Sequence, residues 1–139
     1  MKLIIVAILI MTALFAGCVS SEKTPSKNVT LDLEPSYIKV KNGEIEQVKI
    51  RVNNSGDSNI YALVRFNINS SDKPYLNFTP ESYNLGNLRP GEDSGHRNVD
   101  VRAQLPAGNN ITYVVRLEAV NNNNGIVQDS KDLVITVER

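Results

Sequence analysis

The chain contains one thiol and one imidazole, the side chains that most often serve nucleophilic or metal chemistry. They belong to Cys18 and His96, which stand far apart in a sequence of 139 residues. A lone histidine without further ligands makes a poor transition-metal site, and no serine, histidine and acid follow a hydrolase signature. The composition around His96, Ser94-Gly95-His96-Arg97, predicts an exposed loop histidine. The sequence therefore predicts no catalytic residue, no metal site and no cofactor.

The carboxylates are scattered along the chain and show no metal-binding spacing. Glu92 and Asp93 with the amide of Asn87 offer oxygen ligands of the kind Ca²⁺ takes, but no regular Asp-x-Asp-x-Asp pattern accompanies them. We therefore expect Glu92 and Asp93 to be solvent-exposed carboxylates of a turn. The chain has 15 basic and 15 acidic residues, so it lacks the positive field that holds nucleic acid.

The residues before Cys18 have the order of a secretion signal. Lys2 is a positively charged start, residues 3–15 form an almost unbroken apolar run, and Ala16 and Gly17 are small. The run is shorter than the roughly 20 apolar residues that span a bilayer, and its length suits a signal peptide. Plain secretion and a signal anchor remain as alternatives.

The sequence Leu14-Phe15-Ala16-Gly17-Cys18 resembles the lipobox of prokaryotic lipoproteins. This resemblance implies that the thiol is acylated, that the chain is cut before Cys18, and that the protein is anchored to the outer side of the cell membrane by lipid. Because Cys18 is the only cysteine, an internal disulfide is excluded and lipidation explains the single thiol.

Composition divides the chain into three parts. Residues 1–17 are predicted to be a lipoprotein signal peptide. Residues 18–28 are small, polar and interrupted by Pro25, which is typical of a flexible tether. Residues 29–139 are predicted to be one domain, long enough to form a core without disulfides.

The domain shows the two-residue period of β-strands and no helical period. Turn residues separate the apolar runs at intervals of about ten residues, which favours a two-sheet immunoglobulin-like antiparallel sandwich of seven or eight strands over a barrel. The segment Ser70–Asp93 is predicted to be largely irregular, and Arg89-Pro90-Gly91-Glu92 is predicted to be a type II turn. The predicted strands are Val29–Leu33, Tyr37–Val40, Val48–Val52, Ile60–Ile68, Tyr75–Phe78, Val99–Leu105, Ile111–Ala119 and Ile126–Val137.

Alternation also predicts which residues face the core. Tyr113 is further predicted to form a tyrosine corner, a structural feature of such sandwiches. The predicted core comprises Val48, Ile50, Val52, Val64, Phe66, Val101, Tyr113, Val115, Leu117 and Ile135.

Three stretches resemble the immunoglobulin-like domains of prokaryotic, especially archaeal, surface lipoproteins of the CARDB-like and S-layer-associated kind. The stretches are Val48–Ile60 with its Asn-Ser-Gly loop, Leu85–Glu92 with its Pro-Gly-acidic turn, and Tyr113–Ala119. The resemblance implies a sandwich fold and a cell-surface setting, and it supplies no catalytic residue.

Five asparagines open an Asn-x-Ser/Thr sequon, more than random order of these residues would give. Four are predicted to lie in loops or the tether and one at a strand end, positions accessible to glycosylation. An asparagine-rich loop composition is the alternative. The five are Asn28, Asn53, Asn69, Asn77 and Asn110.

Strand parity also predicts a partner surface. In an immunoglobulin-like sandwich the strand Ile60–Ile68 lies beside the last two strands. Their outward residues then form an apolar centre flanked by arginines, unless the segment Ser70–Asp93 covers it. The residues of this predicted partner face are Tyr61, Leu63, Arg65, Val114, Arg116 and Val134.

These features predict a lipid-anchored, extracytoplasmic domain that acts as a non-enzymatic binding or structural module. The expected partners are the membrane, through the lipid, and a protein of the envelope or S-layer. A ligand- or metal-binding accessory lipoprotein of a transport system is the alternative, and an enzyme is a third reading without an assembled site.

Overall fold

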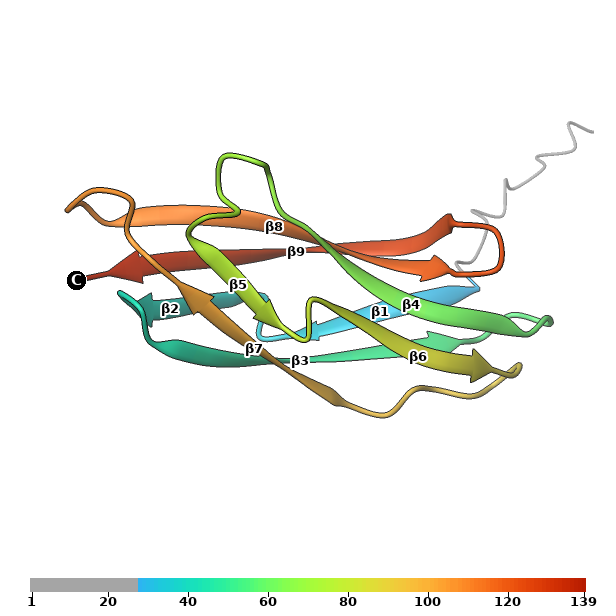
Figure 1. Cartoon of the computed structure of the whole chain (residues 1–139). Coiled ribbons are helices and arrows are strands. Elements are labelled where there is room, and N and C mark those ends of the chain that lie inside the picture. The colour runs from blue at the N-terminus through green and yellow to red at the C-terminus, as the bar shows by residue number, and fades with distance from the viewer. Residues whose placement is uncertain (1–27) are drawn as a thin grey trace, which may run out of the picture.

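The computed structural model describes residues 28–139, and residues 1–27 lie outside its described part. The predicted signal peptide, Cys18 and nearly all of the tether therefore stay predictions. The described residues form nine strands in two sheets packed face to face, without a helix that has the length and apolar character to cross a membrane (Figure 1). The strands are β1 (Val29–Glu34), β2 (Tyr37–Lys41), β3 (Ile45–Asn54), β4 (Ile60–Asn67), β5 (Leu76–Thr79), β6 (Ser82–Leu88), β7 (Arg97–Ala103), β8 (Ile111–Asn121) and β9 (Ile126–Glu138).

The topology is that of an immunoglobulin-like sandwich. One sheet has the strand order β1-β3-β7-β5 and the other the order β2-β9-β8-β4-β6. Neighbouring strands are antiparallel except β2 and β9, which are parallel. The chain changes sheets at every connection except the one between β8 and β9. The bonds Glu34-Pro35 and Thr79-Pro80, at the β1–β2 and β5–β6 connections, are cis. The predicted fold class is confirmed, with nine strands in place of seven or eight. Strand β4 shares a sheet with β8 and β9 as predicted, but it pairs only with β8 of these two.

Strand β6 falls within the segment predicted to be irregular. Ala62 of β4 faces Gly86, whereas Leu63 faces Asn84, so Leu85 is an extra bulged residue. Gly86 has a φ of 76°, and its N–H donates to Oδ1 of Asn84 at 3.0 Å. A bulge shifts the side-chain alternation within the strand, so β6 has no continuous two-residue period to predict it from.

The core lies between the sheets and follows the predicted parity. Nine of the ten predicted core residues are buried, the exception being Phe66. Phe66 is half-buried because the pairing of β4 with β6 ends at Arg65, one residue earlier. Its ring stacks on Phe78 of β5, with centroids 4.9 Å apart.

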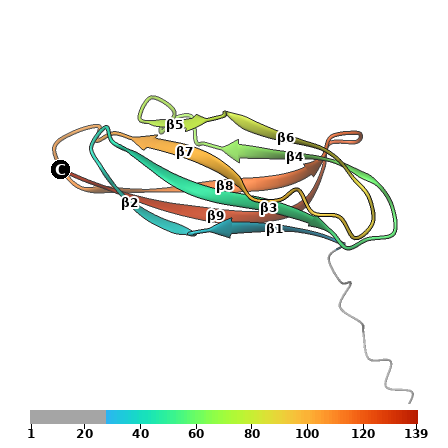
Figure 2. The same ribbon diagram turned by 90° about the horizontal axis from the view of Figure 1, so that it is seen from below.

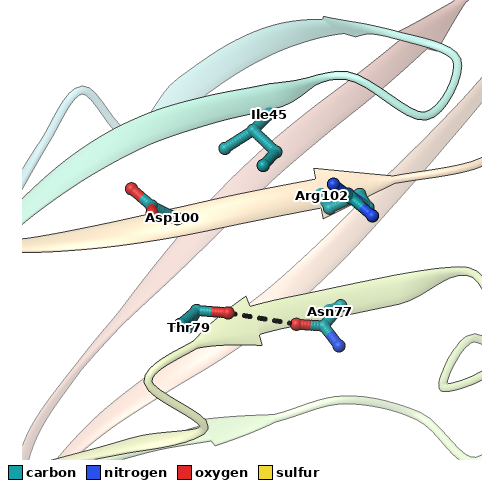
Figure 3. Close-up of a pocket in the computed structure, with 5 residues that line it drawn as sticks. All are labelled: Ile45, Asn77, Thr79, Asp100 and Arg102. Carbon is teal, nitrogen blue, oxygen red and sulfur yellow. Dashed lines mark hydrogen bonds between the residues drawn. The ribbon is translucent and has the colours of Figure 1, made fainter.

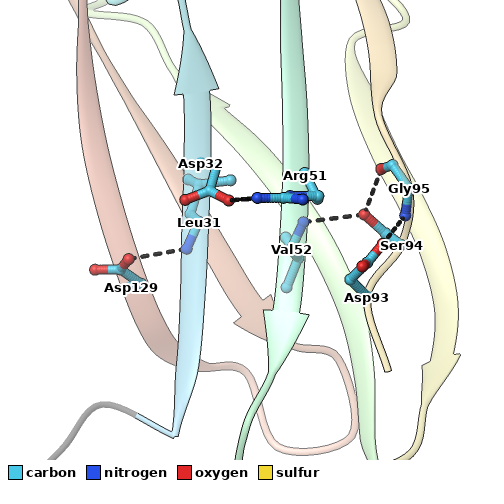
Figure 4. Close-up of polar contacts among 8 residues, drawn as sticks. All are labelled: Leu31, Asp32, Arg51, Val52, Asp93, Ser94, Gly95 and Asp129. Carbon is cyan, nitrogen blue, oxygen red and sulfur yellow. Dashed lines mark hydrogen bonds and ion pairs between the residues drawn. The ribbon is translucent and has the colours of Figure 1, made fainter. Parts of the chain in front are cut away.

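A buried carboxylate joins the two sheets at one seam of the sandwich (Figure 4). Oδ2 of Asp129 on β9 accepts a hydrogen bond of 2.9 Å from the N–H of Leu31 on β1. The N–H of Leu31 belongs to an edge strand, which would otherwise leave this donor without a strand partner. Asp129 therefore satisfies the edge of β1 from inside the molecule.

Tyr113 forms the predicted tyrosine corner. Its side chain is buried in β8, and its hydroxyl donates to the backbone oxygen of Gln104 at 3.0 Å. This bond ties β8 to the link that precedes it. Burial, the largest influence, raises the pKa of Tyr113 above its ordinary value.

The two ends of the described chain lie at opposite ends of the sandwich (Figures 1 and 2). The end with Asn28 also carries the loop after β3 and the turn between β8 and β9. Backbone bonds hold this end together, from Ser55 N to Asn28 O at 2.8 Å and from Gly91 N to Asn54 O at 2.7 Å. The faces of both sheets therefore run lengthwise between the two ends.

Candidate functional site

The structure places all six residues of the predicted partner face on the outer side of the five-stranded sheet. Each of them alternates with buried or half-buried neighbours in β4, β8 or β9. Tyr61 and Val114 are exposed, and Leu63 and Val134 are half-buried. Val114 is 52% exposed, so no segment of the described chain covers its part of the face. The segment expected as a possible cover instead pairs along the edge of the sheet as β6.

One apolar row crosses three strands of this face. Tyr37 on β2 lies opposite Val134 on β9, which lies opposite Val114 on β8. Tyr37 is missing from the predicted face, because β2 pairs in parallel with a strand almost 100 residues later. In the sequence, the one signal for Tyr37 is its alternation with the apolar Ile38 and Val40 in the predicted strand Tyr37–Val40.

A second apolar row crosses the same face nearer the end that carries Asn28. Leu63 on β4 lies opposite Val120 on β8, which lies opposite Val127 on β9. Val120 is buried, yet its side chain is not part of the core between the sheets. Tyr61 extends this row along β4.

Two ion pairs separate the apolar rows. Arg65 contacts Glu118 at 3.0 Å between Nη2 and Oε2, and Arg116 contacts Asp132 at 3.1 Å between Nε and Oδ1. The hydrogen bond and charge of Asp132 raise the pKa of Arg116. The prediction that the arginines flank one apolar centre is therefore wrong in arrangement, because they lie between two apolar rows.

The opposite sheet carries a shallow depression of about 300 Å³ on its outer face (Figure 3). Ile45 of β3, Arg102 of β7 and Asn77 of β5 lie side by side across it. Thr79 donates its hydroxyl to Oδ1 of Asn77 at 3.3 Å, and Asp100 accepts from Gln47 at 2.8 Å. This set contains donors, acceptors and one apolar side chain but no nucleophile beside a base.

The sequon asparagines are divided between loops and the four-stranded sheet. Asn28, Asn69 and Asn110 are exposed and outside the strands, and Asn77 is exposed on β5. Asn53 was predicted to lie in a loop, but it is half-buried in β3, opposite Thr30 and bridged to Asp93. None of the five lies in a strand of the five-stranded sheet.

The turn carboxylates Glu92 and Asp93 accept hydrogen bonds from the backbone of their own turn. Glu92 accepts from the N–H of Arg89 at 2.9 Å, and Asp93 accepts from the N–H of Gly95 at 2.7 Å (Figure 4). His96 is exposed before β7, as predicted. Within residues 28–139, no three His, Cys, Asp or Glu side chains gather as a metal site would require.

The buried hydroxyl of Ser94 ties this turn to the sandwich. Ser94 Oγ accepts from the N–H of Val52 at 2.9 Å and donates to the carbonyl of Gly95 at 2.9 Å (Figure 4). Next to Val52 along β3, Arg51 forms an ion pair of 2.7 Å with Asp32 on β1. These contacts stabilise the fold.

Comparison with known proteins identifies the fold and no family. No family model and no curated protein matches the sequence. Escherichia coli alpha-2-macroglobulin matches with a TM-score of 0.58 and 16% identity, over 80% of this chain and 7% of that one. The FixG-related protein of Vibrio parahaemolyticus matches with 0.56 and 8% identity, over 81% and 98%.

Salmonella alpha-2-macroglobulin reacted with methylamine is a third match, with a TM-score of 0.52, 18% identity, and coverage of 79% and 7%. The chain thus spans a small part of the macroglobulins' length. At such identities the likeness shows the β-sandwich fold alone, and function has to be argued from the surfaces of this chain.

Proposed function

We propose that this protein is a lipid-anchored, extracytoplasmic and non-enzymatic module that binds a protein neighbour of the cell envelope or S-layer. The binding surface is the outer face of the five-stranded sheet, called the partner face below. The observation that carries the proposal is the pair of apolar rows on this face, Tyr37–Val134–Val114 and Leu63–Val120–Val127.

The composition of the partner face suits a protein partner. Grouped exposed apolar side chains mark interaction surfaces on soluble domains. Interfaces combine such side chains with arginine and tyrosine, and the face carries Arg65, Arg116, Tyr37 and Tyr61. The ion pairs Arg65–Glu118 and Arg116–Asp132 between its rows lie at the surface. Surface ion pairs contribute little to stability, so a partner that displaces these two destabilises the domain little.

The proposed lipid anchor would leave the partner face accessible to neighbouring proteins. If Cys18 carries the lipid, it lies ten positions before Asn28, a reach of at most about 35 Å. The end of the sandwich with Asn28 then faces the membrane, and the partner face stands sideways toward neighbours. The sequons lie outside the strands of this sheet, so glycans attached there leave the central strands free.

The anchor is tested with Cys18→Ser and cell fractionation. We expect the parent protein in the membrane fraction with an acyl adduct in its intact mass, and the variant without the adduct and released. A variant that stays in the membrane, together with a parent whose intact mass shows no adduct, contradicts the lipid anchor.

The partner face is tested with Val114→Lys and crosslinking on intact cells. Ile45→Lys is the matched control, because Ile45 is 51% exposed but lies on the other sheet. We expect Val114→Lys to lose crosslinked neighbours that the parent and the control keep. If Val114→Lys and Leu63→Lys both fold and keep the same neighbours, the partner face is not the binding surface.

A further inference from the structure

A cleft of about 360 Å³ opens at the seam between strand β5 and the end of β4. It lies at the side of the sandwich, away from the partner face. Phe66 and Ile68 line it from β4 and the residue just beyond, and Leu76 and Phe78 line it from β5. Its volume lies within the range of ligand-binding pockets.

The floor of the cleft is apolar and connects to the core. Leu76 and Phe78 are buried, and Phe66 and Ile68 pack half-buried against the core. The rings of Phe66 and Phe78 stack with an interplanar angle of 20°. A large apolar side chain entering the cleft would therefore meet aromatic and aliphatic carbon.

Backbone hydrogen-bonding groups border the same cleft. Strand β5 is the last strand of its sheet and pairs only with β7. The carbonyl of Tyr75 accepts from Gln104 on the β7 side, whereas the N–H of Leu76 turns the other way and donates to Asp72. Because these directions alternate along an antiparallel strand, the N–H and C=O of Phe78 also point to the open edge.

Two charges of opposite sign stand at the rim. Lys73 and Glu81 both line the cleft and are exposed. Neither forms an ion pair with another residue of the described chain. A fatty acid has one anionic head and would match Lys73 alone, whereas a peptide can match both charges and the free backbone groups of Phe78.

We propose that this cleft binds an extended peptide segment of a partner protein. The segment adds a strand to the edge of β5, inserts one large apolar side chain over Phe66 and Phe78, and places an acidic residue toward Lys73 and a basic residue toward Glu81. Strand addition supplies affinity through the backbone and specificity through alternate side chains. This site is independent of the partner face and of the lipid anchor.

The test uses two fluorescein-labelled nonapeptides and the full chain in lipid nanodiscs. Both peptides alternate threonine and valine around a central leucine. One begins with lysine and ends with glutamate, and the other has these charges exchanged. Fluorescence anisotropy gives Kd for the parent, for the exchange Lys73→Glu with Glu81→Lys, and for Ile68→Glu. Dodecanoate is the competing acyl probe, and Lys49→Glu is the control on an outer surface.

We expect the parent to prefer one peptide by about fivefold, the effect of two exposed ion pairs. The double exchange should invert that preference, and Lys49→Glu should leave it unchanged. Ile68→Glu should weaken both peptides at least tenfold. Because Lys73 and Glu81 are exposed, we expect the double exchange to leave the domain folded, so a change in preference reports on binding. Equal binding of the two peptides, no inversion, or dodecanoate binding without peptide binding overturns the proposal.

Discussion

The stacked pair Phe66 and Phe78 allows a quantitative test of how the sandwich is packed. Phe78 is 3% exposed, so Phe78→Ala should cost about 3–5 kcal/mol of unfolding free energy, as in closed cores. Phe66 is half-buried at the mouth of the cleft and retains contact with water. Phe66→Ala should therefore cost about 1.5–3 kcal/mol, below the range for a closed core.

The two rings should also be energetically coupled. Aromatic pairs contribute about 0.5–1.5 kcal/mol beyond the area they bury, so the double variant should be less destabilised than the sum of the single variants by about that amount. Urea unfolding of the chain without residues 1–17 measures all four species, because every strand of the sandwich lies within residues 29–138. Val114→Ala is the exposed control and should change stability by less than about 0.5 kcal/mol.

Two results would refute this account of the pair. A cost of Phe66→Ala that equals or exceeds the cost of Phe78→Ala would mean that Phe66 is as enclosed as the sequence predicted. Additive single costs would mean that the rings do not stack in solution.

Three further substitutions test the contacts that shape the domain. Tyr113→Phe removes the bond to Gln104 and should cost about 0.5–1.5 kcal/mol. Because burial raises the folded-state pKa of Tyr113, the parent should lose stability as pH rises above about 10 and through that raised pKa, and urea unfolding against pH should show a smaller loss for Tyr113→Phe. Asp129→Ala leaves the N–H of Leu31 without its acceptor and should cost about 1–3 kcal/mol, with faster hydrogen exchange at Leu31 and partial recovery in Asp129→Asn. Gly91 has a φ of 81° and open space around its Cβ position, so Gly91→Ala should cost about 1–2 kcal/mol from backbone strain alone, measured by thermal unfolding.

Much of the fold could be predicted because alternation survives in its long strands. β3, β7, β8 and β9 each bury every second residue over part of their length, so parity alone identifies the core face. Where a local event interrupts the period, the prediction failed. Because of the bulge at Leu85, the residues of β6 were predicted to be irregular. Because the order Asn53-Asn54-Ser55-Gly56 is typical of a turn, the last residues of β3 were predicted to be a loop.

The partner face could be predicted only in part for the same physical reason. Parity within one strand tells which residues share a face, and all six predicted residues do share it. Parity does not give the register between strands, which brings Arg65 opposite Glu118 and Arg116 opposite Asp132. It also does not reveal a parallel partner far along the chain, which is why Tyr37 was missed.

The edges of the two sheets differ in how their free backbone groups are treated, and this difference singles out β5. Exposed edges invite pairing with other chains, and proteins protect them with lysines, bulges or internal caps. Strand β2 carries Lys39 and Lys41, β6 is broken by its bulge, and the N–H of Leu31 on β1 is capped by Asp129.

Strand β5 has no lysine and no bulge, and Asp72 caps only the N–H of Leu76. The backbone groups of Phe78 keep only the shortness of the strand as a safeguard, and its open side faces an apolar cleft with two charges at the rim. An edge of this kind is costly to keep bare, because it exposes both backbone groups and apolar surface. Occupation by a short extended segment satisfies both at once, which a ligand without a peptide backbone does not do.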